Sequence, residues 1–329
     1  MYTEITSKLT GQKLEEWKCF ITASDLKADL LIEKTVILWD GDKIAATGSR
    51  YNNILKLIAV DPSYRGEDLT STVISELRRD AFCDGYRSLF LYTKPQNESI
   101  FTSLFFHTIA KTRDLVLLED RKDGIKTFID PLPLANISGK IASVVMNCNP
   151  FTLGHQYLIE LAARECDYLY VFVLSEDKSE FSAKDRMEMV KLGTSHLSNV
   201  SVVPTGPYLI SSATFPTYFL KDRDNVTDVQ CRLDIEVFTE YFVPKFGITH
   251  RYVGSEPLSA MTNAYNEALK QNLPSKGIEL IEIDRKKIGN DPISASHVRK
   301  LVKDNKTNEL ASWLPDTTIN YLKEKGYLN

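Results

Sequence analysis

The chain has 329 residues, a length at which a single hydrophobic core usually gives way to separate domains, so we expect two. Its 40 basic and 44 acidic residues leave a formal net charge of −4, which excludes a general electrostatic attraction to nucleic acid or to an anionic membrane surface. Five scattered cysteines without a CxxC pair are typical of a reducing cytosol. There is no signal-peptide pattern, and no run approaches the roughly 18 apolar residues of a membrane span. We therefore expect a cytoplasmic protein with no nucleic-acid or membrane partner.

The first part of the chain predicts a mixed α/β domain. Residues 34–40 and 43–48 are typical of a β-hairpin with Gly41 in its turn. Apolar residues at helical spacing predict a helix over 69–82. The remaining predicted elements are strands at 54–60, 88–92 and 115–119 and a helix at 98–106.

Two prolines mark the predicted domain boundary. Pro131 and Pro133 restrain the backbone, and small polar residues follow them, as in many interdomain connections. We therefore divide the chain near Pro133, into domains 1–133 and 134–329.

Strand and helix patterns alternate regularly after the boundary. This alternation predicts a doubly wound parallel sheet. Ligands of such sheets bind at the carboxyl ends of strands, where the connections reverse direction. We therefore expect chemistry just after Met146, just after Leu174 and near Val253. The predicted strands are 141–146, 168–174, 200–203, 251–253 and 278–283, and the predicted helices are 155–164, 183–192, 231–242 and 263–270.

The first candidate site follows strand 141–146 and opens a helix. Pro150 fixes the loop, and Gly154 lets backbone approach a ligand closely. His155 would lie in the first helical turn, where unpaired N–H groups and the helix dipole favour phosphate, and it can donate a hydrogen bond to phosphate oxygens. An ordinary Asn-Pro turn with Thr152 as helix cap explains the same residues, so both interpretations stay open. The segment reads Asn149-Pro150-Phe151-Thr152-Leu153-Gly154-His155.

The second candidate follows Asp291-Pro292 and is also expected to open a helix. Ser294 and Ser296 can cap the helix and donate hydrogen bonds, and Arg299 projects from the same face as Ser296. Hydroxyls, free N–H groups and a guanidinium together suit a polyphosphate. Taken alone, the pattern favours a plain helix start with a surface arginine. The segment reads Ile293-Ser294-Ala295-Ser296-His297-Val298-Arg299.

A third cluster begins at Lys178, just beyond strand 168–174, with Arg186 on the next predicted helix. A lysine at the carboxyl end of a strand can neutralise phosphate charge. Lys178 stands among other charged residues, and such lysines are more often simply solvated, so this signal is weak by itself.

Together the three segments resemble the HIGH-motif nucleotidylyltransferase superfamily. Residues 151–155 are similar to its T/HxGH motif, with threonine in place of the first histidine, and residues 293–299 are similar to its ISSTxxR phosphate motif, from which Ala295 and His297 depart. Lys178-x-x-Phe181-x-x-x-x-Arg186 resembles a segment of phosphopantetheine adenylyltransferases. The resemblance implies a Rossmann-like domain from about Lys140 onward that uses ATP with Mg²⁺, directs attack to the α-phosphate and releases pyrophosphate.

The resemblance also implies roles for individual residues. His155 would steady the α-phosphate, and Ser294, Ser296 and Arg299 would hold the β and γ phosphates with help from Lys178. Gly254 and Glu256 follow a predicted strand and would flank the nucleotide pocket. The predicted catalytic residues are His155, Lys178 and Arg299, no residue is assigned to a metal, and the predicted nucleotide-binding residues are Asn149, Pro150, Phe151, Thr152, Gly154, His155, Gly254, Glu256, Ile293, Ser294, Ser296 and Arg299.

The N-terminal part has a resemblance of its own. Residues 60–69 follow a predicted strand, open a helix and resemble the pyrophosphate loop of GNAT acyltransferases, which normally reads Q/R-x-x-G-x-G/A. Ser63 replaces the first basic or amide residue, and Asp68 replaces the last small one with a carboxylate that repels pyrophosphate. Residues 94–97 and 101–106 resemble the second half of that fold. Pantetheine binding and a degenerate domain kept for protein contacts both remain open.

A GNAT-like domain followed by a HIGH-type nucleotidylyltransferase domain resembles the citrate lyase ligase family over nearly the whole chain. That resemblance implies that acetate attacks ATP to give acetyl-adenylate and pyrophosphate. The acetyl group would then pass to the thiol of a CoA-like prosthetic group on the acyl-carrier (gamma) subunit of citrate lyase, and AMP would leave. Two alternatives remain: an adenylyltransferase that makes a nucleotide cofactor product, and a carrier-docking module with a vestigial nucleotide site.

Overall fold

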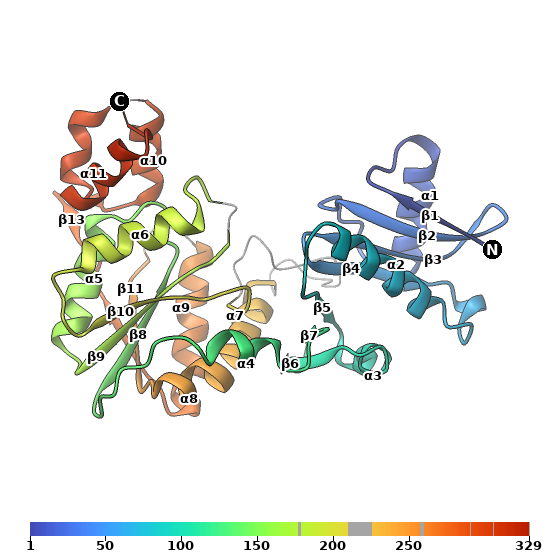
Figure 1. Cartoon of the computed structure of the whole chain (residues 1–329), viewed down its shortest axis with the longest axis horizontal. Helices are drawn as coiled ribbons and strands as arrows, with labels where there is room; N and C mark the ends of the chain where they lie inside the picture. Colours follow the sequence, from blue (N-terminus) through green and yellow to red (C-terminus); the bar gives the residue numbers. More distant parts are fainter. Residues whose placement is uncertain (177–178, 210–225, 257–259, 290, 305, 329) are drawn as a thin grey trace. The chain divides into compact units, whose positions relative to one another are not determined.

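The computed structural model describes residues 1–176, 179–209, 226–256, 260–289, 291–304 and 306–328 (Figure 1). These residues form two compact units, one of Met1–Gly124 with residues 226–229, and the other of residues 125–209 with 230–328. The compact units divide after Gly124. The boundary near Pro133 between the two predicted domain types stays a prediction. Within the described part of the chain, no helix is long and apolar enough to cross a membrane.

The first unit is built on a seven-stranded mixed sheet with the order β1-β2-β3-β4-β5-β7-β6. Its pairs are antiparallel except for β4 and β5, which run parallel. The core lies where α2 packs on the sheet through Val73, Ile74 and Leu77, all at most 1% exposed. The strands are β1 (Tyr2–Thr6), β2 (Lys34–Asp40), β3 (Lys43–Tyr51), β4 (Ile54–Val60), β5 (Phe90–Thr93), β6 (His107–Lys111) and β7 (Val116–Glu119), and the helices are α1 (Gly11–Ala23), α2 (Leu69–Cys83) and α3 (Glu98–Thr102).

The predicted mixed α/β class of this unit is confirmed, and so is its hairpin, while some other elements differ. The β2–β3 hairpin turns at Gly41, which has the left-handed φ of 58° that favours glycine. The helix predicted over 98–106 ends at Thr102, and Phe105 has a φ of 64°, which a helix does not allow. Strand β6 follows at once. The strands β1 and β6 and the helix α1 were not predicted.

The second unit contains a parallel five-stranded sheet with the order β10-β9-β8-β11-β12. Beginning at the central β8, the chain adds β9 and β10 on one side and then β11 and β12 on the other. This is a doubly wound sheet whose direction switches between β8 and β11, as the alternation predicted. The strands are β8 (Ile141–Met146), β9 (Tyr168–Val173), β10 (Val200–Pro204), β11 (His250–Gly254) and β12 (Glu279–Ile283), and a small hairpin joins β13 (Lys287–Ile288) to β14 (Asp291–Pro292).

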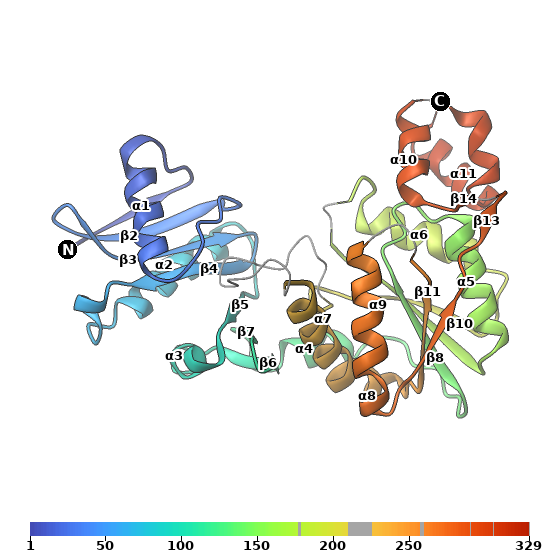
Figure 2. The same cartoon turned by 180° about the vertical axis from the view of Figure 1, so that it is seen from behind.

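Helices cover both faces of this sheet (Figures 1 and 2). Strands such as β8 are apolar on both faces because both are buried, which explains their continuous β-branched runs. On one face α5 and α6 bury an aliphatic core. On the other, Phe172 packs edge-on against Phe238, Phe242 and Phe246. The helices are α4 (Gly124–Ile129), α5 (Leu153–Arg164), α6 (Ala183–Thr194), α7 (Val226–Val237), α8 (Val243–Phe246), α9 (Ala260–Asn272), α10 (Ala295–Lys303) and α11 (Asp316–Glu324), with a π-helical turn at Phe238–Phe242.

Candidate active site

A cavity of about 710 Å³ opens at the carboxyl ends of β8 and β11, where the sheet switches direction. Met146 and Asn147 line it from the end of β8, and Gly254 lines it from the end of β11. Two of the three places predicted from strand ends, after Met146 and near Val253, therefore meet at one cavity. Of the predicted nucleotide-binding residues, those that line it are Thr152, Gly154, His155, Gly254, Glu256, Ile293, Ser294 and Ser296.

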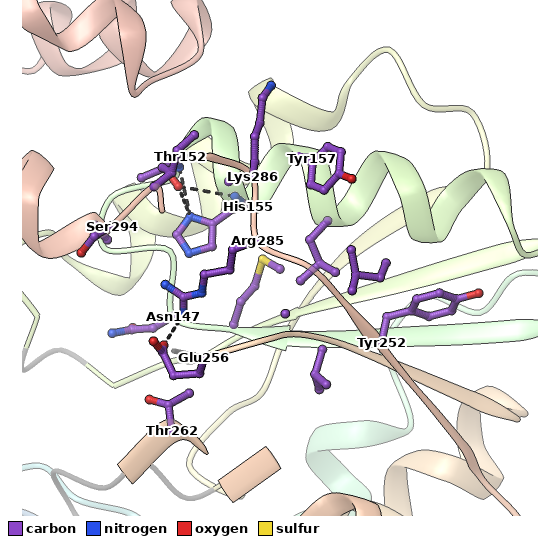
Figure 3. Close-up of a pocket in the computed structure, with 18 of the residues that line it drawn as sticks. Asn147, Thr152, His155, Tyr157, Tyr252, Glu256, Thr262, Arg285, Lys286 and Ser294 are labelled. Carbon is purple, nitrogen blue, oxygen red and sulfur yellow. Dashed lines mark hydrogen bonds and ion pairs between the residues drawn. The ribbon is translucent and has the colours of Figure 1, made fainter. Parts of the chain in front are cut away.

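The imidazole of His155 is held by the N-terminus of its own helix (Figure 3). Its Nδ1 accepts a hydrogen bond from the backbone N–H of Thr152 at 3.0 Å, and the hydroxyl of Thr152 accepts one from the backbone N–H of His155 at 3.4 Å. This is a capping box with histidine in the position that glutamate usually takes. Because Nδ1 accepts, the proton of the neutral ring lies on Nε2, the nitrogen left to donate to a ligand in the cavity.

The environment of His155 favours its neutral form. Burial, reinforced by the nearby positive charge of Arg285, lowers the pKa of His155 from 6.5 to about 4. The ring also stacks on Phe151 at a centroid distance of 5.9 Å. At neutral pH the residue is therefore an uncharged hydrogen-bond donor fixed in one orientation.

The two sequence motifs pack directly against each other. A Cβ atom added to Gly154 would lie 3.3 Å from two carbons of Ile293, so the start of α5 approaches the segment before α10 as closely as glycine allows. Arg299 joins the loops: it donates to the carbonyl of Asn149 at 2.6 Å and to the hydroxyl of Ser296 at 3.0 Å. Residues about 150 positions apart in the chain are thus in direct contact beside the cavity.

The start of α10 presents its polar groups to the cavity. Ser294 is the N-cap residue, yet its side chain makes no capping hydrogen bond. Both Ser294 and Ser296 line the cavity. The first N–H groups of a helix have no partner within the helix, so this end is suited to an anion.

Four predicted residues lie beside the cavity without lining it, and their contacts are internal. Asn149 accepts a hydrogen bond from the backbone N–H of Phe181 at 3.2 Å, and it is joined to Pro150 by a cis peptide bond. Phe151 is fully buried and fills the space above Gly193. Arg299 makes the two contacts described above. Lys178 lies outside the described residues, so its predicted catalytic role remains a prediction.

Arg186, from the third cluster, is a structural residue. Its guanidinium is fully buried and donates to the carbonyls of Asn147 at 2.9 Å, Leu174 at 2.8 Å and Glu176. It also donates to the side chain of Asn147 at 2.5 Å. Arg186 therefore ties the carboxyl ends of β8 and β9 together and fixes the side chain that enters the cavity.

Sequence reasoning missed the basic residues that follow β12. Arg285 and Lys286 line the cavity directly after this strand, and Lys286 lies 6.0 Å from the ring of Tyr157 (Figure 3). The same rule about strand ends, applied to the predicted strand 278–283, would have found them. Asn147 was missed in the same way, although it follows β8.

The carboxylate of Glu256 is already engaged by a neighbouring side chain. Its side chain is 6% exposed and pairs with the guanidinium of Arg285, which also donates to the carbonyl of Ser255 at 2.8 Å. The pair (Figure 3) leaves Arg285 facing both Glu256 and His155. Among the described residues, no group of three or more His, Cys, Asp or Glu side chains could hold a metal ion.

Comparisons with known proteins identify the family. The family model for the citrate lyase ligase C-terminal domain matches residues 141–322. The [citrate [pro-3S]-lyase] ligases of Klebsiella pneumoniae and Escherichia coli K12 are 37% and 35% identical, covering 93% and 95% of this chain and 91% of each relative. The enzyme of the same name from Haemophilus influenzae Rd is 38% identical over 96% of both chains. The chain belongs to the citrate lyase ligase family.

Proposed function

We propose that this protein is an acetate:citrate-lyase ligase, an AMP-forming acid–thiol ligase. The observation that carries the proposal is the single cavity lined by both His155 and the Ser294–Ser296 segment at the switch point of the sheet. Family membership adds the class of reaction, and the predicted fold of the second unit agrees with it.

In the first step an oxygen of acetate attacks the α-phosphorus of ATP. A P–O bond forms to give acetyl-adenylate, the bond to the β-phosphate bridge breaks, and pyrophosphate leaves with the electron pair. The Nε2–H of His155 donates to a non-bridging α-phosphate oxygen as negative charge grows there. Because the ring is neutral, it supplies a hydrogen bond and no proton.

The remaining triphosphate lies between the two helix starts. The N–H groups and hydroxyls at Ser294 and Ser296 receive the β and γ phosphates, and Lys286 supplies positive charge from the end of β12. Arg299 contacts Ser296 and the carbonyl of Asn149, so the role we assign to it is to hold these two loops in register.

Mg²⁺ belongs to this proposal as part of the substrate. Glu256 is engaged with Arg285, and the described residues contain no acidic cluster that would hold the ion alone. Mg²⁺ usually keeps several waters and is held largely by substrate phosphates, so it would enter with ATP.

In the second step the thiol of the carrier's prosthetic group attacks the acetyl carbon, a thioester forms and AMP leaves.

The first unit offers a place for a pantetheine arm. β4 and β5 pair only at their starts, Ile54 with Phe90 and Leu55 with Leu91. A cavity of about 400 Å³ extends past the paired part, lined by residues that include Val60, Thr93 and Lys94. Asp68 opens α2 with a left-handed φ of 57°, so a carboxylate stands where the resembling GNAT loop has a small residue.

The test is acetate-dependent exchange of labelled pyrophosphate into ATP, run without a carrier and with a panel of short carboxylates. Wild type should exchange with acetate, and His155→Ala should lose about a hundredfold or more in rate, the scale of one lost transition-state donor. His196→Ala serves as a matched control, because this histidine is half exposed and contacts Glu160 on the outer face of α5.

Two outcomes would reject the proposal. Exchange that is independent of any carboxylate, with a stable adenylylated product, would favour the adenylyltransferase. Absence of ATP binding by calorimetry would favour a carrier-docking protein with a vestigial site.

A further inference from the structure

A buried arginine lines the same cavity and has no part in the ATP site proposed above. Arg251 is the second residue of β11, three positions before the strand end at Gly254, and it is 2% exposed. In the part of the chain that the structure describes, its Nε has no hydrogen-bond partner and its guanidinium forms no ion pair. The guanidinium carbon lies 4.5 Å from the ring centroid of Phe238.

A buried arginine without a partner is stabilised when an anion binds to it. Arginine keeps its charge in folded proteins, and a buried guanidinium is costly unless a partner neutralises it. The backbone around it is already used, because Arg251 pairs with Ser143 of β8 and Leu280 of β12 in the parallel sheet. Stacking on Phe238 covers one face of the fork and leaves its N–H edge to a ligand.

The polar neighbours of Arg251 in the cavity have their own partners. The hydroxyl of Tyr265 donates to Asp234 at 2.5 Å, and the amide of Asn266 donates to the carbonyl of Gly254 at 2.9 Å. Burial and the adjacent Asp234 raise the pKa of Tyr265 well above its usual value, so it remains a neutral phenol. Among the described residues near Tyr265, Arg251 is therefore the cation whose side chain has no direct partner.

The positively charged groups that line the cavity fall into two sets, each of which suits an anion. Whereas the charge of Arg285 is offset by Glu256, Lys286 and the helix starts form one positive group, which matches the triphosphate. ATP carries all its negative charge there, since adenine and ribose are uncharged. A second positive group in the same cavity matches a second anion, and in this reaction the second reactant is a carboxylate. Val145 and Val253 also line the cavity, and an apolar surrounding strengthens an ion pair.

We propose that Arg251 is the carboxylate-binding residue for the acid substrate. One carboxylate oxygen accepts a hydrogen bond from the guanidinium, and the other keeps its lone pairs for attack on the α-phosphorus. Neutralising the carboxylate also reduces its repulsion by the triphosphate. This inference rests on the proposed function for the identity of the acid, but its test has an independent readout.

The test uses the full chain with Arg251→Met and Arg251→Gln. Methionine fills similar space without charge, and replacing an uncompensated buried charge by an apolar side chain is often neutral or stabilising. We expect the thermal midpoint of Arg251→Met to equal or exceed that of wild type. The KM for acetate in pyrophosphate exchange should rise about 10- to 100-fold, the range for a hydrogen bond to a charged group, while the KM for ATP stays unchanged. Arg164→Met is the matched control, because that side chain is 72% exposed.

A second measurement needs no turnover. Saturation-transfer NMR should detect acetate on wild type in the presence of α,β-methylene-ATP, and either Arg251 variant should remove the signal. A wild-type affinity for acetate in a folded variant overturns the inference, as does a raised KM for ATP with an unchanged KM for acetate. If wild type binds acetate through Arg251 but shows no acetate-dependent exchange, the proposed function fails and the carboxylate site stands.

Discussion

The properties of His155 follow from three neighbours. The backbone N–H of Thr152 occupies Nδ1 and so fixes the proton on Nε2. Phe151 stacks on the ring, and Arg285 adds positive charge that disfavours protonation. Neutral histidine is the form that can keep the capping box and donate to a phosphate at the same time. A protonated ring would have to donate from Nδ1 and would lose the hydrogen bond from the backbone N–H of Thr152.

The low pKa of His155 gives a prediction for stability against pH. The folded-state pKa of about 4 lies below the unfolded value of about 6.5, so the unfolded state binds more protons between these limits. Stability should therefore fall as pH drops from about 6.5 to about 4. The loss attributable to His155 should be on the order of 1–3 kcal/mol.

Urea denaturation of wild type and His155→Gln at several pH values measures this contribution. The glutamine variant keeps a polar side chain at the third helical position but does not titrate, so its stability should fall less over the same interval. Parallel curves for the two proteins would show that His155 titrates normally.

At the scale of elements, the local sequence pattern was sufficient to predict a strand wherever an apolar run is buried on both faces of the sheet. β4 and β8 have the predicted limits, and the cavity lies at two of the strand ends that the parallel alternation indicated. Elements with few buried residues were missed: in α1 only Trp17 and Ile21 of thirteen residues are buried, so its pattern is weak. Contacts between distant elements produce no recognisable pattern in the local sequence. The bond from Arg299 to Asn149 and the unpartnered state of Arg251 depend on pairing that one sequence does not reveal.

The packing of α5 against the segment before α10 gives an element-scale prediction. In Gly154→Ala the new methyl would meet Ile293 at 3.3 Å, so one side must shift. Overpacking of this kind usually destabilises by about 1–3 kcal/mol. Alanine's helix propensity offsets at most about 1 kcal/mol, and less in a first turn. We expect a net loss in the free energy of unfolding and a higher KM for ATP.

A double-mutant cycle with Ile293→Ala tests whether that contact is responsible. Ile293→Ala should destabilise the Gly154→Ala protein less than it destabilises wild type, because it also relieves the clash. Strictly additive effects would place the origin of the Gly154→Ala defect elsewhere.

At the scale of the whole molecule, each compact unit has a hydrophobic core of its own. Every residue that lines the candidate active-site cavity belongs to the second unit. Acetate activation should therefore require the second unit alone, whereas transfer to a carrier thiol would draw on the first as well. The position of the boundary decides whether a fragment of the second unit is stable.

The segment before Pro133 belongs physically to the second unit, which predicts different stabilities for two fragments. Ile125 and Ile129 are 4% and 3% exposed, and the ring of Phe128 lies 5.5 Å from that of Tyr208. Burial of an isoleucine contributes roughly 1.5–3 kcal/mol, so a fragment 134–329 should be less stable than 125–329 by about 3 kcal/mol or more. Urea denaturation measures the difference, and Phe128→Ala in the longer fragment should lose part of it. The longer fragment should also keep acetate-dependent pyrophosphate exchange. Equal stability of the two fragments would instead support a functional boundary at Pro133, since the residues before it would then contribute nothing to the second core.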